Sequence, residues 1–283
     1  IASFLENRTF QAKIDGALSS RHICAAGVPQ GSILGPILYC LYNADVPTTS
    51  KTKILMYADD IVVYSISQNP TFSVSKTQEH IAKLESWFNK WRISINHEKC
   101  QAVLFTRCKK RPRGNLHIYN HEIFFTDYAK YLGIMLDQKL LWHRHIATTK
   151  AKANARISLI FPLLKSPVLS LKRKVMLYKT LILPILTYAS PAWCYVPKSV
   201  FKPLQTTQNR ALRIIHASDW YTTTVQIHED LNMKTLKELL KEQIKKFYKN
   251  IEESDNIFIR SLGQYNCRAY STHRTPKLFM CES

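Results

Sequence analysis

The sequence predicts an α+β protein, in which an antiparallel sheet with packed helices is followed by a mainly helical part. Three observations support this prediction. Two β-branched apolar runs flank the acidic pair Asp59-Asp60, three glycines cluster between residues 27 and 35, and from about Leu140 onward apolar residues recur at helical spacing. With 283 residues, of which 46% are hydrophobic, the chain can form one or two domains with real cores.

The acidic pair lies in Tyr57-Ala58-Asp59-Asp60, between apolar runs at 54–56 and 61–64. This pattern predicts a tight β-hairpin with both acids at its turn. Two adjacent carboxylates are costly to desolvate unless a cation neutralises them. Mg²⁺ prefers oxygen ligands and commonly binds one or two carboxylates plus substrate phosphates. Phosphoryl chemistry is therefore the first hypothesis, and a solvated turn is the alternative.

The charge balance indicates a polyanionic partner. The chain has 40 Lys and Arg against 20 Asp and Glu, which gives a formal net charge of +20. A field of this sign and size favours nucleic acid as the partner. The seven cysteines form no CxxC pair, which predicts reduced thiols in an intracellular protein. Cys267, His273 and Cys281 have a spacing that fits no closed zinc site well.

No signal peptide is visible at the start, and no membrane span is expected. The most apolar stretch, residues 175–196, contains Lys179, Pro184 and Pro191. A buried helix with a proline-induced break explains this stretch better than a membrane span does. Because the chain begins with Ile1, we expect it to be a piece of a longer reading frame.

The glycine cluster is Gly27-Val28-Pro29-Gln30-Gly31-Ser32-Ile33-Leu34-Gly35-Pro36. Such clustering predicts a loop whose backbone turns sharply and lies close to a ligand or to another strand. It is not a Walker loop, because the glycine spacing differs and no lysine follows the Gly-Ser pair. Pro36 suits the first turn of a following helix. The apolar face of that helix is predicted at Ile37, Leu38, Leu41 and Tyr42.

A glycine loop followed by an acidic hairpin resembles the palm of a reverse transcriptase. The surrounding sequence resembles the jockey-type enzymes of non-LTR, LINE-like retrotransposons. Four more segments are similar to that family: the lead-in at 3–10, the segment after the helix at 41–47, the primer-grip region Tyr131-Leu132-Gly133 and the thumb entry at 142–146. The resemblance runs from the first residue to about residue 215.

This resemblance implies a domain order and a function. Residues 1–138 would form a partial palm, residues 139–232 a helical thumb-like region, and residues 233–283 a C-terminal basic helix and tail. The implied activity is RNA-directed DNA synthesis, by two-metal nucleotidyl transfer to a primer 3′-hydroxyl. The implied cofactor is Mg²⁺, or Mn²⁺ in its place. The implied partners are an RNA template, a DNA primer, deoxynucleoside triphosphates and the N-terminal part of the same polyprotein. The nucleus is the expected location, since synthesis would be primed at the target DNA, and the cytoplasm is the alternative.

The resemblance also assigns roles to single residues. Asp59 and Asp60 match the metal-binding acids, and Lys99 matches a lysine that protonates or neutralises pyrophosphate; a solvated surface lysine is the alternative for Lys99. Tyr57 would lie beside the primer end. The residues expected against template and nucleotide are Gly27, Pro29, Gln30, Gly31 and Tyr57, and those of the primer grip are Tyr131, Leu132 and Gly133.

One part of the family pattern is missing. A complete palm takes a further aspartate from a strand well before the glycine loop, and the only acids before Gly27 are Glu6 and Asp15. Asp15-Gly16 predicts a hairpin turn, and Glu6 lies in the lead-in. Because charge stabilisation is usually the largest catalytic contribution, we expect this chain alone to be inactive or nearly so. The alternative is a non-catalytic, basic nucleic-acid-binding remnant of a transposon.

Two basic clusters are candidate phosphate contacts. The first comprises Arg107, Lys109, Lys110, Arg111 and Arg113. This cluster would either bind phosphates or act as a nuclear localisation signal. The alternative is a solvated basic turn. The second is Lys172, Arg173 and Lys174, in the first turn of a helix predicted over residues 171–182. The helix dipole does not favour cations there, so a phosphate partner is plausible.

The remaining elements form a frame for the site. Amphipathic helices are predicted over residues 74–91 and 234–251, and short strands over 103–105, 116–119 and 128–134. The segment 234–251 has apolar residues on one side and lysines on the other. We expect the apolar side to pack in the core and the lysine side to face solvent. The alternative is that the helix binds a membrane surface or calmodulin. His143 and His145 are interpreted as structural, because no third metal ligand accompanies them.

Overall fold

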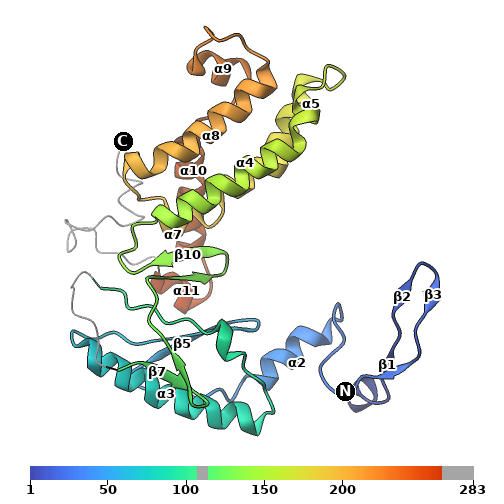
Figure 1. Ribbon diagram of the computed structural model, residues 1–283, viewed down its shortest axis with the longest axis vertical. Coiled ribbons are helices and arrows are strands. Elements are labelled where there is room, and N and C mark those ends of the chain that lie inside the picture. Colours follow the sequence, from blue (N-terminus) through green and yellow to red (C-terminus); the bar gives the residue numbers. More distant parts are fainter. Residues whose placement is uncertain (107–113, 263–283) are drawn as a thin grey trace. The chain divides into compact units, whose positions relative to one another are not determined.

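The computed structural model describes residues 1–106 and 114–262 (Figure 1). The chain divides into two compact units. Unit 1 consists of Ile1–Cys100 and Lys110–Phe124, and unit 2 of Gln101–Lys109 and Phe125–Ser283. Both helices and strands are present, which confirms the predicted α+β class.

The described residues of unit 1 form short strands and three α-helices. Its elements are α1 Ala2–Leu5, β1 Thr9–Phe10, β2 Lys13–Ile14, β3 Ala17–Leu18, β4 His22–Ile23, α2 Leu34–Tyr42, β5 Lys53–Tyr57, β6 Asp60–Tyr64, α3 Pro70–Lys90, the 3₁₀ turn η1 His97–Lys99, β7 Leu116–Ile118 and β8 His121–Ile123. The strand pairs are β1–β4, β2–β3, β5–β6 and β7–β8, all antiparallel. The β2–β3 turn is Asp15-Gly16, with φ of 48° and 87°, so the predicted hairpin turn is confirmed.

Helix α3 organises the core of unit 1. It begins four residues before the predicted start, because Pro70 is its first residue and the Asn69 side chain accepts a hydrogen bond from the Thr71 N–H at 3.0 Å. Its buried centre is Leu84, Trp87 and Phe88. Partly buried residues of β5 and β6 pack against this centre: Ile54, Ile61 and Val63. The acidic hairpin is thereby seated on α3.

Two strand predictions were wrong. Residues 103–105 form no strand, and their region contributes one isolated parallel bridge between Ala102 and Phe125. Residues 128–134 are not one strand but a hairpin, β9 Tyr128–Tyr131 and β10 Ile134–Asp137. The strand ends at Leu132 and Gly133, because both have positive φ (44° and 79°) and reverse the chain. The described strands thus form five separate two-stranded sheets and not one continuous sheet.

Unit 2 is mainly helical. After β9 and β10 come α4 His143–Lys165, α5 Leu171–Leu177, the π-helix η2 Tyr178–Ile182, α6 Leu183–Thr187, α7 Ser190–Trp193, α8 Lys198–His216, α9 Thr224–Asp230, α10 Leu236–Glu252 and α11 Ile257–Leu262. The predicted helix 171–182 breaks before Pro184, as expected. Proline lacks the N–H that would continue the α-helical bonding, and the Leu183 N–H instead bonds to the Tyr178 carbonyl in the π pattern.

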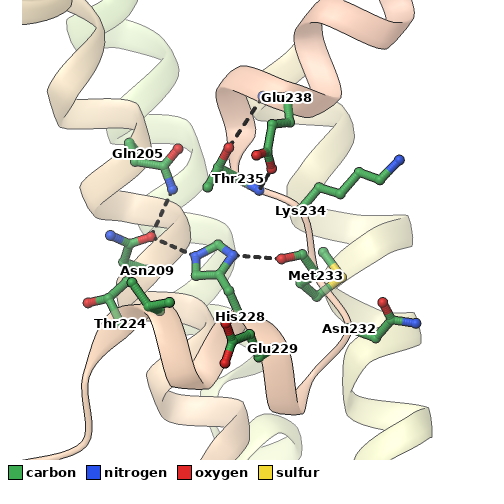
Figure 2. A pocket seen from close by; sticks show the side chains of 11 residues that line it. Gln205, Asn209, Thr224, His228, Glu229, Asn232, Met233, Lys234, Thr235 and Glu238 are labelled. Atoms are coloured by element: carbon green, nitrogen blue, oxygen red, sulfur yellow. Dashed lines mark hydrogen bonds between the residues drawn. The ribbon is translucent and has the colours of Figure 1, made fainter.

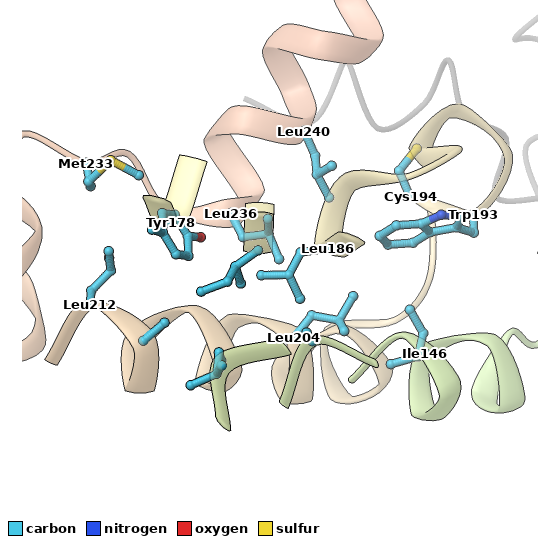
Figure 3. Packing of buried hydrophobic residues seen from close by; sticks show 14 of the residues in the cluster. Ile146, Tyr178, Leu186, Trp193, Cys194, Leu204, Leu212, Met233, Leu236 and Leu240 are labelled. Carbon is cyan, nitrogen blue, oxygen red and sulfur yellow. The ribbon is translucent and has the colours of Figure 1, made fainter. Parts of the chain in front are cut away.

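A single apolar cluster holds the helices of unit 2 together (Figure 3). Side chains from α4, α6, α8 and α10 meet there with almost no solvent exposure: Ile157, Leu186, Leu204, Leu236 and Leu240. The apolar face of the segment 234–251 is therefore core packing. The Thr235 side chain caps α10 in a capping box with Glu238.

The two units differ from the predicted domain boundaries at 138/139 and 232/233. The β9–β10 hairpin belongs to the helical unit, since β10 contacts α4 and Leu136 packs on the unit 2 core. Within the described residues, helix α10 packs into the same core as the helices before it. Within residues 1–106 and 114–262, no helix is both long and apolar enough to cross a membrane.

Asp45 ties the segment after α2 to the end of α3. Its carboxylate accepts hydrogen bonds from the Trp87 indole at 2.7 Å, the Lys90 ammonium at 3.1 Å and the Trp91 indole at 3.1 Å. The hydrogen bond from Trp87 is the largest cause that lowers the pKa of Asp45 below its usual value, and Lys90 and Trp91 add to it.

This arrangement predicts an acid-sensitive contact. Because the pKa of Asp45 is lower in the folded protein than in the unfolded chain, the contact stabilises the fold above the unfolded pKa and is lost as the pH falls through the folded pKa. The indole N–H signals of Trp87 and Trp91 should therefore shift together in NMR spectra below about pH 4. Asp45→Asn should abolish this transition, whereas Glu79→Gln, on the exposed side of α3, should preserve it. Indole signals that stay constant in the wild type would contradict the prediction.

Candidate active site

The acidic turn is the exposed tip of the β5–β6 hairpin. Tyr57 pairs with Asp60 across the ladder, so Ala58 and Asp59 form a two-residue loop. Ala58 adopts a left-handed φ of 50°. Both acids are exposed, and the Tyr57 side chain is 64% exposed. The structure thus places Asp59 and Asp60 at a hairpin turn, as predicted.

A tyrosine that the sequence analysis missed fixes this turn. The Tyr39 hydroxyl, on α2, donates a hydrogen bond to the Ala58 carbonyl. The bond joins the helix that follows the glycine loop to the residue before Asp59. Tyr39 is 40% exposed and lies outside the apolar face predicted for α2, which is the only sequence signal that it had another role.

The glycine loop has the backbone geometry that its sequence predicts. Gly27 and Gly31 both have φ of 80°, a conformation that residues with a Cβ rarely adopt. Gly35 is buried, and a Cβ there would lie 3.1 Å from the Ser32 Oγ. Ser32 closes the loop, because its Oγ donates to the Pro29 carbonyl at 2.8 Å and accepts from the Gly35 N–H at 3.0 Å. The hydroxyl therefore caps the first turn of α2.

Arg8 gives the lead-in segment a physical role. Its Nη2 donates to the Gly27 carbonyl at 2.6 Å, and its Nε donates to the Leu5 carbonyl at 3.0 Å. One guanidinium thus joins the lead-in to the start of the glycine loop. Sequence similarity over residues 3–10 marked this segment but did not single out Arg8.

Other predicted residues of unit 1 are exposed but not joined to the acids. Gln30 lies at the loop tip and Lys99 ends η1. In the described part of the chain, no hydrogen bond or ion pair links either side chain to Asp59 or Asp60. The apolar face predicted for α2 is only partly covered, since Ile37 is 54% and Leu41 63% exposed. We therefore correct that prediction: α2 is anchored by hydroxyl contacts more than by burial.

The two acids form an incomplete oxygen donor set. The described residues contain no group of three or more His, Cys, Asp or Glu side chains close enough to hold a metal ion. Mg²⁺ is commonly held by only one or two carboxylates, with substrate phosphates and water as its other ligands. Asp59 and Asp60 fit that use, provided that the substrate supplies the remaining oxygens.

The predicted primer-grip residues form the β9–β10 turn of unit 2. The Tyr188 hydroxyl donates to the Leu132 carbonyl at 2.8 Å. A Cβ on Gly133 would lie 3.2 Å from Tyr188 Cε1. Leu132 occupies the left-handed region at φ 44°, so the tyrosine again holds the carbonyl of a turn residue that carries a side chain.

The predicted basic clusters differ in what the structure shows of them. The cluster at 107–113 and the cysteine-histidine group at 267–281 lie outside the described residues. Lys172 and Arg173 are exposed. Lys174 is only 8% exposed and packs into unit 2, so we correct its assignment as a phosphate contact.

The sequence analysis overlooked a long stretch of the chain that contains basic residues and no acidic ones. Between residues 138 and 218 the sequence has 14 Lys and Arg and no Asp or Glu. This acid-free stretch covers α4, α5 and α8, and it holds most of the chain's net charge. Charge counted along the chain in windows would have found it.

His145 is structural, as interpreted from the sequence. It is 4% exposed, with ring centroids 6.0 Å from Trp142 and 5.6 Å from Trp193. Burial, and secondarily the charge of Lys152, lowers the pKa of His145 below its usual value. The side chain therefore fills an aromatic pocket as a neutral ring.

Comparison with known proteins identifies relatives of the whole chain. Residues 1–136 match the family described as "Reverse transcriptase (RNA-dependent DNA polymerase)". The chain is 30% identical over 283 residues to "Probable RNA-directed DNA polymerase from transposon X-element" of Drosophila melanogaster, over 98% of the chain and 31% of that protein. It is 35% identical over 279 residues to "RNA-directed DNA polymerase from mobile element jockey" of the same organism, over 93% of the chain and 30% of that protein.

A third relative has the same coverage. The jockey polymerase of Drosophila funebris is 33% identical over 277 residues, which is 93% of the chain and 30% of that protein. The chain thus spans about 30% of the length of the curated relatives that it matches.

The Tyr39 contact predicts a local effect on the acidic turn. Tyr39→Phe removes a hydrogen bond of the size that typically contributes about 0.5–1.5 kcal/mol. The Asp59 and Asp60 amides should then exchange with solvent about two- to tenfold faster in hydrogen-exchange NMR. Tyr42→Phe is the matched control, since the Tyr42 hydroxyl donates from the same helix to the Trp91 carbonyl, away from the turn. Equal effects of the two variants on the turn would contradict the prediction.

We predict that the β9–β10 turn needs glycine at position 133. Its φ is left-handed, and a Cβ there would lie against the Tyr188 ring. Gly133→Ala should lower the opening free energy of the β9 and β10 amides by about 1–2 kcal/mol for the left-handed φ alone, and further for the contact with Tyr188. Hydrogen exchange of these amides measures the change. In a Tyr188→Ala background the same substitution should cost less, because the ring contact is gone. A cost that is the same in both backgrounds would show that Tyr188 does not constrain the turn.

Proposed function

Residues 1–136 of this chain belong to the reverse transcriptase family, and on that premise we propose that the chain is the metal-binding and primer-handling part of an RNA-directed DNA polymerase of a jockey-type mobile element. The observation that carries the proposal is the acidic turn. Asp59 and Asp60 lie exposed at the tip of a hairpin that Tyr39 ties to the helix after the glycine loop. Two carboxylates and a glycine loop are thereby held in one small framework.

In this proposal unit 1 and the β9–β10 hairpin are parts of a palm, and the helices of unit 2 form a thumb. Asp59 and Asp60 hold the divalent metal, which we take to be Mg²⁺ or Mn²⁺. When bound, such ions activate the primer 3′-hydroxyl and stabilise the leaving pyrophosphate. The carboxylates are already exposed at the turn, so a metal reaches them without a rearrangement of the hairpin.

The other proposed roles follow the positions of the side chains. Tyr57 precedes the turn and is 64% exposed, which suits contact with the primer end. Gln30 and the backbone of Gly27 and Gly31 contact template and nucleotide, because φ values of 80° leave the loop backbone open to close approach. Lys99 supplies a proton or positive charge to the pyrophosphate.

The proposed substrates are an RNA template, a DNA primer and deoxynucleoside triphosphates. The proposed location is the nucleus, where the target DNA would prime synthesis. The curated relatives are about three times as long as the chain, and a polyprotein partner that completes the metal site is part of the proposal.

A second candidate function is nucleic-acid binding without catalysis. The acid-free stretch 138–218 favours it, because 14 cations without an acid can neutralise many phosphates. Such binding needs no third carboxylate. Both functions include binding of nucleic acid, so catalysis and not binding separates them.

Primer extension tests the proposal. We expect this chain alone to bind a primer on an RNA template and to extend it poorly or not at all with Mg²⁺ or Mn²⁺, because Asp59 and Asp60 are the only acids assigned to the metal. The variant Asp59→Asn, Asp60→Asn should bind the primer at least as well and also fail to extend it. Adding the upstream part of a relative's polymerase should restore extension only to the wild-type chain.

Extension by the chain alone that disappears in the double variant would overturn the predicted inactivity and would confirm the roles of the acids. Restored extension that is equal in both proteins would contradict the assignment of Asp59 and Asp60. Glu79→Gln is the matched control, because Glu79 is an exposed acid of unit 1 that pairs with Lys76 away from the turn.

A further inference from the structure

The loop between α8 and α9 exposes two aromatic rings. Trp220 is 92% exposed and Tyr221 is 68% exposed, whereas Trp87, Trp142 and Trp193 are at most 5% exposed. The two exposed rings meet edge to face, with centroids 5.9 Å apart and planes at 83°. Burial of an aromatic ring is among the largest stabilising contributions in a fold. An aromatic pair that stays in water therefore indicates a binding surface.

The backbone of this loop is fixed by one arginine of α8. Arg213 donates through Nη1 to the Asp219 carbonyl at 3.1 Å and through Nη2 to the Thr222 carbonyl at 2.9 Å. The Tyr221 hydroxyl donates to the Asp219 carboxylate at 2.7 Å. The guanidinium thus bridges the two sides of the loop. Rings on a fixed backbone lose little conformational entropy when a partner binds.

The far end of the loop is fixed through α9 (Figure 2). His228 places its Nδ1 2.8 Å from the Met233 carbonyl and its Nε2 3.1 Å from the Asn209 Oδ1 of α8. Gln205 Nε2 donates to the same Asn209 oxygen at 2.8 Å. Both ends of the loop are therefore attached to α8, and the rings project from a rigid frame.

Cations lie on the helices beside this loop. Helix α8 ends at the loop and has Arg210 and Arg213 in its last two turns, whereas the loop and α9 carry Asp219, Glu229 and Asp230. The α4–α5 connection and the α8–α9 loop lie at the same end of the helical unit, drawn at the top of Figure 1. The exposed cations Lys172 and Arg173 follow the α4–α5 connection. This end of unit 2 thus combines exposed aromatic rings with three exposed cations, Lys172, Arg173 and Arg210, that form no ion pair in the described part of the chain.

We propose that Trp220 and Tyr221 form a stacking platform for an unpaired nucleobase of a single strand, whose phosphates are held by the cations at the same end of unit 2. The proposal rests on the proposed nucleic-acid function and adds a site to it. A base offers its π face only where it is unstacked, so the platform selects single-stranded segments over the interior of a duplex.

A lipid surface fits the loop less well. A membrane-binding segment needs a broad apolar face. Around the two rings, Val225 is the one other large apolar side chain of the loop and α9 that is exposed, at 67%, and the Asp219 carboxylate lies beside the rings. The small apolar area therefore favours one or two bases, and their phosphates would be held by the cations of α5 and α8 and not at the rings themselves.

The platform is tested by comparing how the wild type and Trp220→Ala bind a strand with bases and a strand without them. The probe is a fluorescein-labelled oligothymidylate, compared by anisotropy with an abasic strand of the same length and charge. Trp220→Ala should weaken binding to the oligothymidylate by roughly five- to a hundredfold, which corresponds to the usual contribution of one stacked base. Trp220→Phe should retain most of the affinity. The wild type and Trp220→Ala should bind the abasic strand equally.

Two controls separate stacking from other causes. Phe258→Ala removes another exposed aromatic ring, 80% exposed on α11, and should leave both affinities unchanged. Thermal melting should be the same for Trp220→Ala and the wild type, because the ring buries little surface. Equal loss of affinity for both strands would overturn the platform, since bases would then not matter.

The remaining outcomes distinguish this proposal from the proposed function. If the wild type binds neither strand, the nucleic-acid function itself fails. If the wild type binds the oligothymidylate and Trp220→Ala binds it equally well, only the platform is wrong. Binding to phosphatidylserine vesicles that Trp220→Ala abolishes, with oligothymidylate binding unchanged, would assign the rings to a lipid surface and overturn the proposal.

Discussion

Two-residue hairpin turns need a left-handed φ at their first loop position, and this requirement determines how the β5–β6 turn of unit 1 and the β9–β10 turn of unit 2 are built. Ala58 and Leu132 meet it at φ of 50° and 44°, although each has a Cβ that disfavours the conformation by about 1–2 kcal/mol. In both turns the carbonyl of that residue accepts a hydrogen bond from a tyrosine hydroxyl, Tyr39 in unit 1 and Tyr188 in unit 2. The direction of the acids after Ala58 thus depends on a contact made by the preceding helix, α2.

The two units are stabilised in different ways. Unit 2 contains the acid-free stretch 138–218, whose cations repel one another and oppose a compact state. Its core offsets that repulsion, because side chains of four helices are almost completely buried in one cluster. Unit 1 has a smaller buried centre at α3 and relies more on polar contacts, such as the three hydrogen bonds to Asp45. A polyanion would relieve the repulsion in unit 2 and so stabilise it on binding.

The sequence predicted those elements whose signals are local. Apolar runs on both sides of Asp59-Asp60 were enough for the β5–β6 hairpin, and Asp15-Gly16 was enough for the β2–β3 turn. The missed features depend on residues far apart in the chain. Tyr39 and Ala58 are 19 positions apart, Asp45 and Trp87 are 42 apart, and Leu132 and Tyr188 are 56 apart. No periodicity encodes such pairs. The strand predicted across 128–134 failed because Leu132, a residue common in regular elements, occupies a turn conformation.

The open position of the acids has a chemical consequence for the proposed polymerase. A divalent cation held by Asp59 and Asp60 alone would keep most of its water ligands, because an exposed turn supplies few other oxygens. The free energy of binding such an ion would then come mainly from the phosphates that arrive with the nucleotide. Metal and nucleotide would therefore bind together and not in sequence. The rigidity that Tyr39 gives to the turn matters for this reason, since two ligands can direct a metal only if the backbone that carries them is fixed.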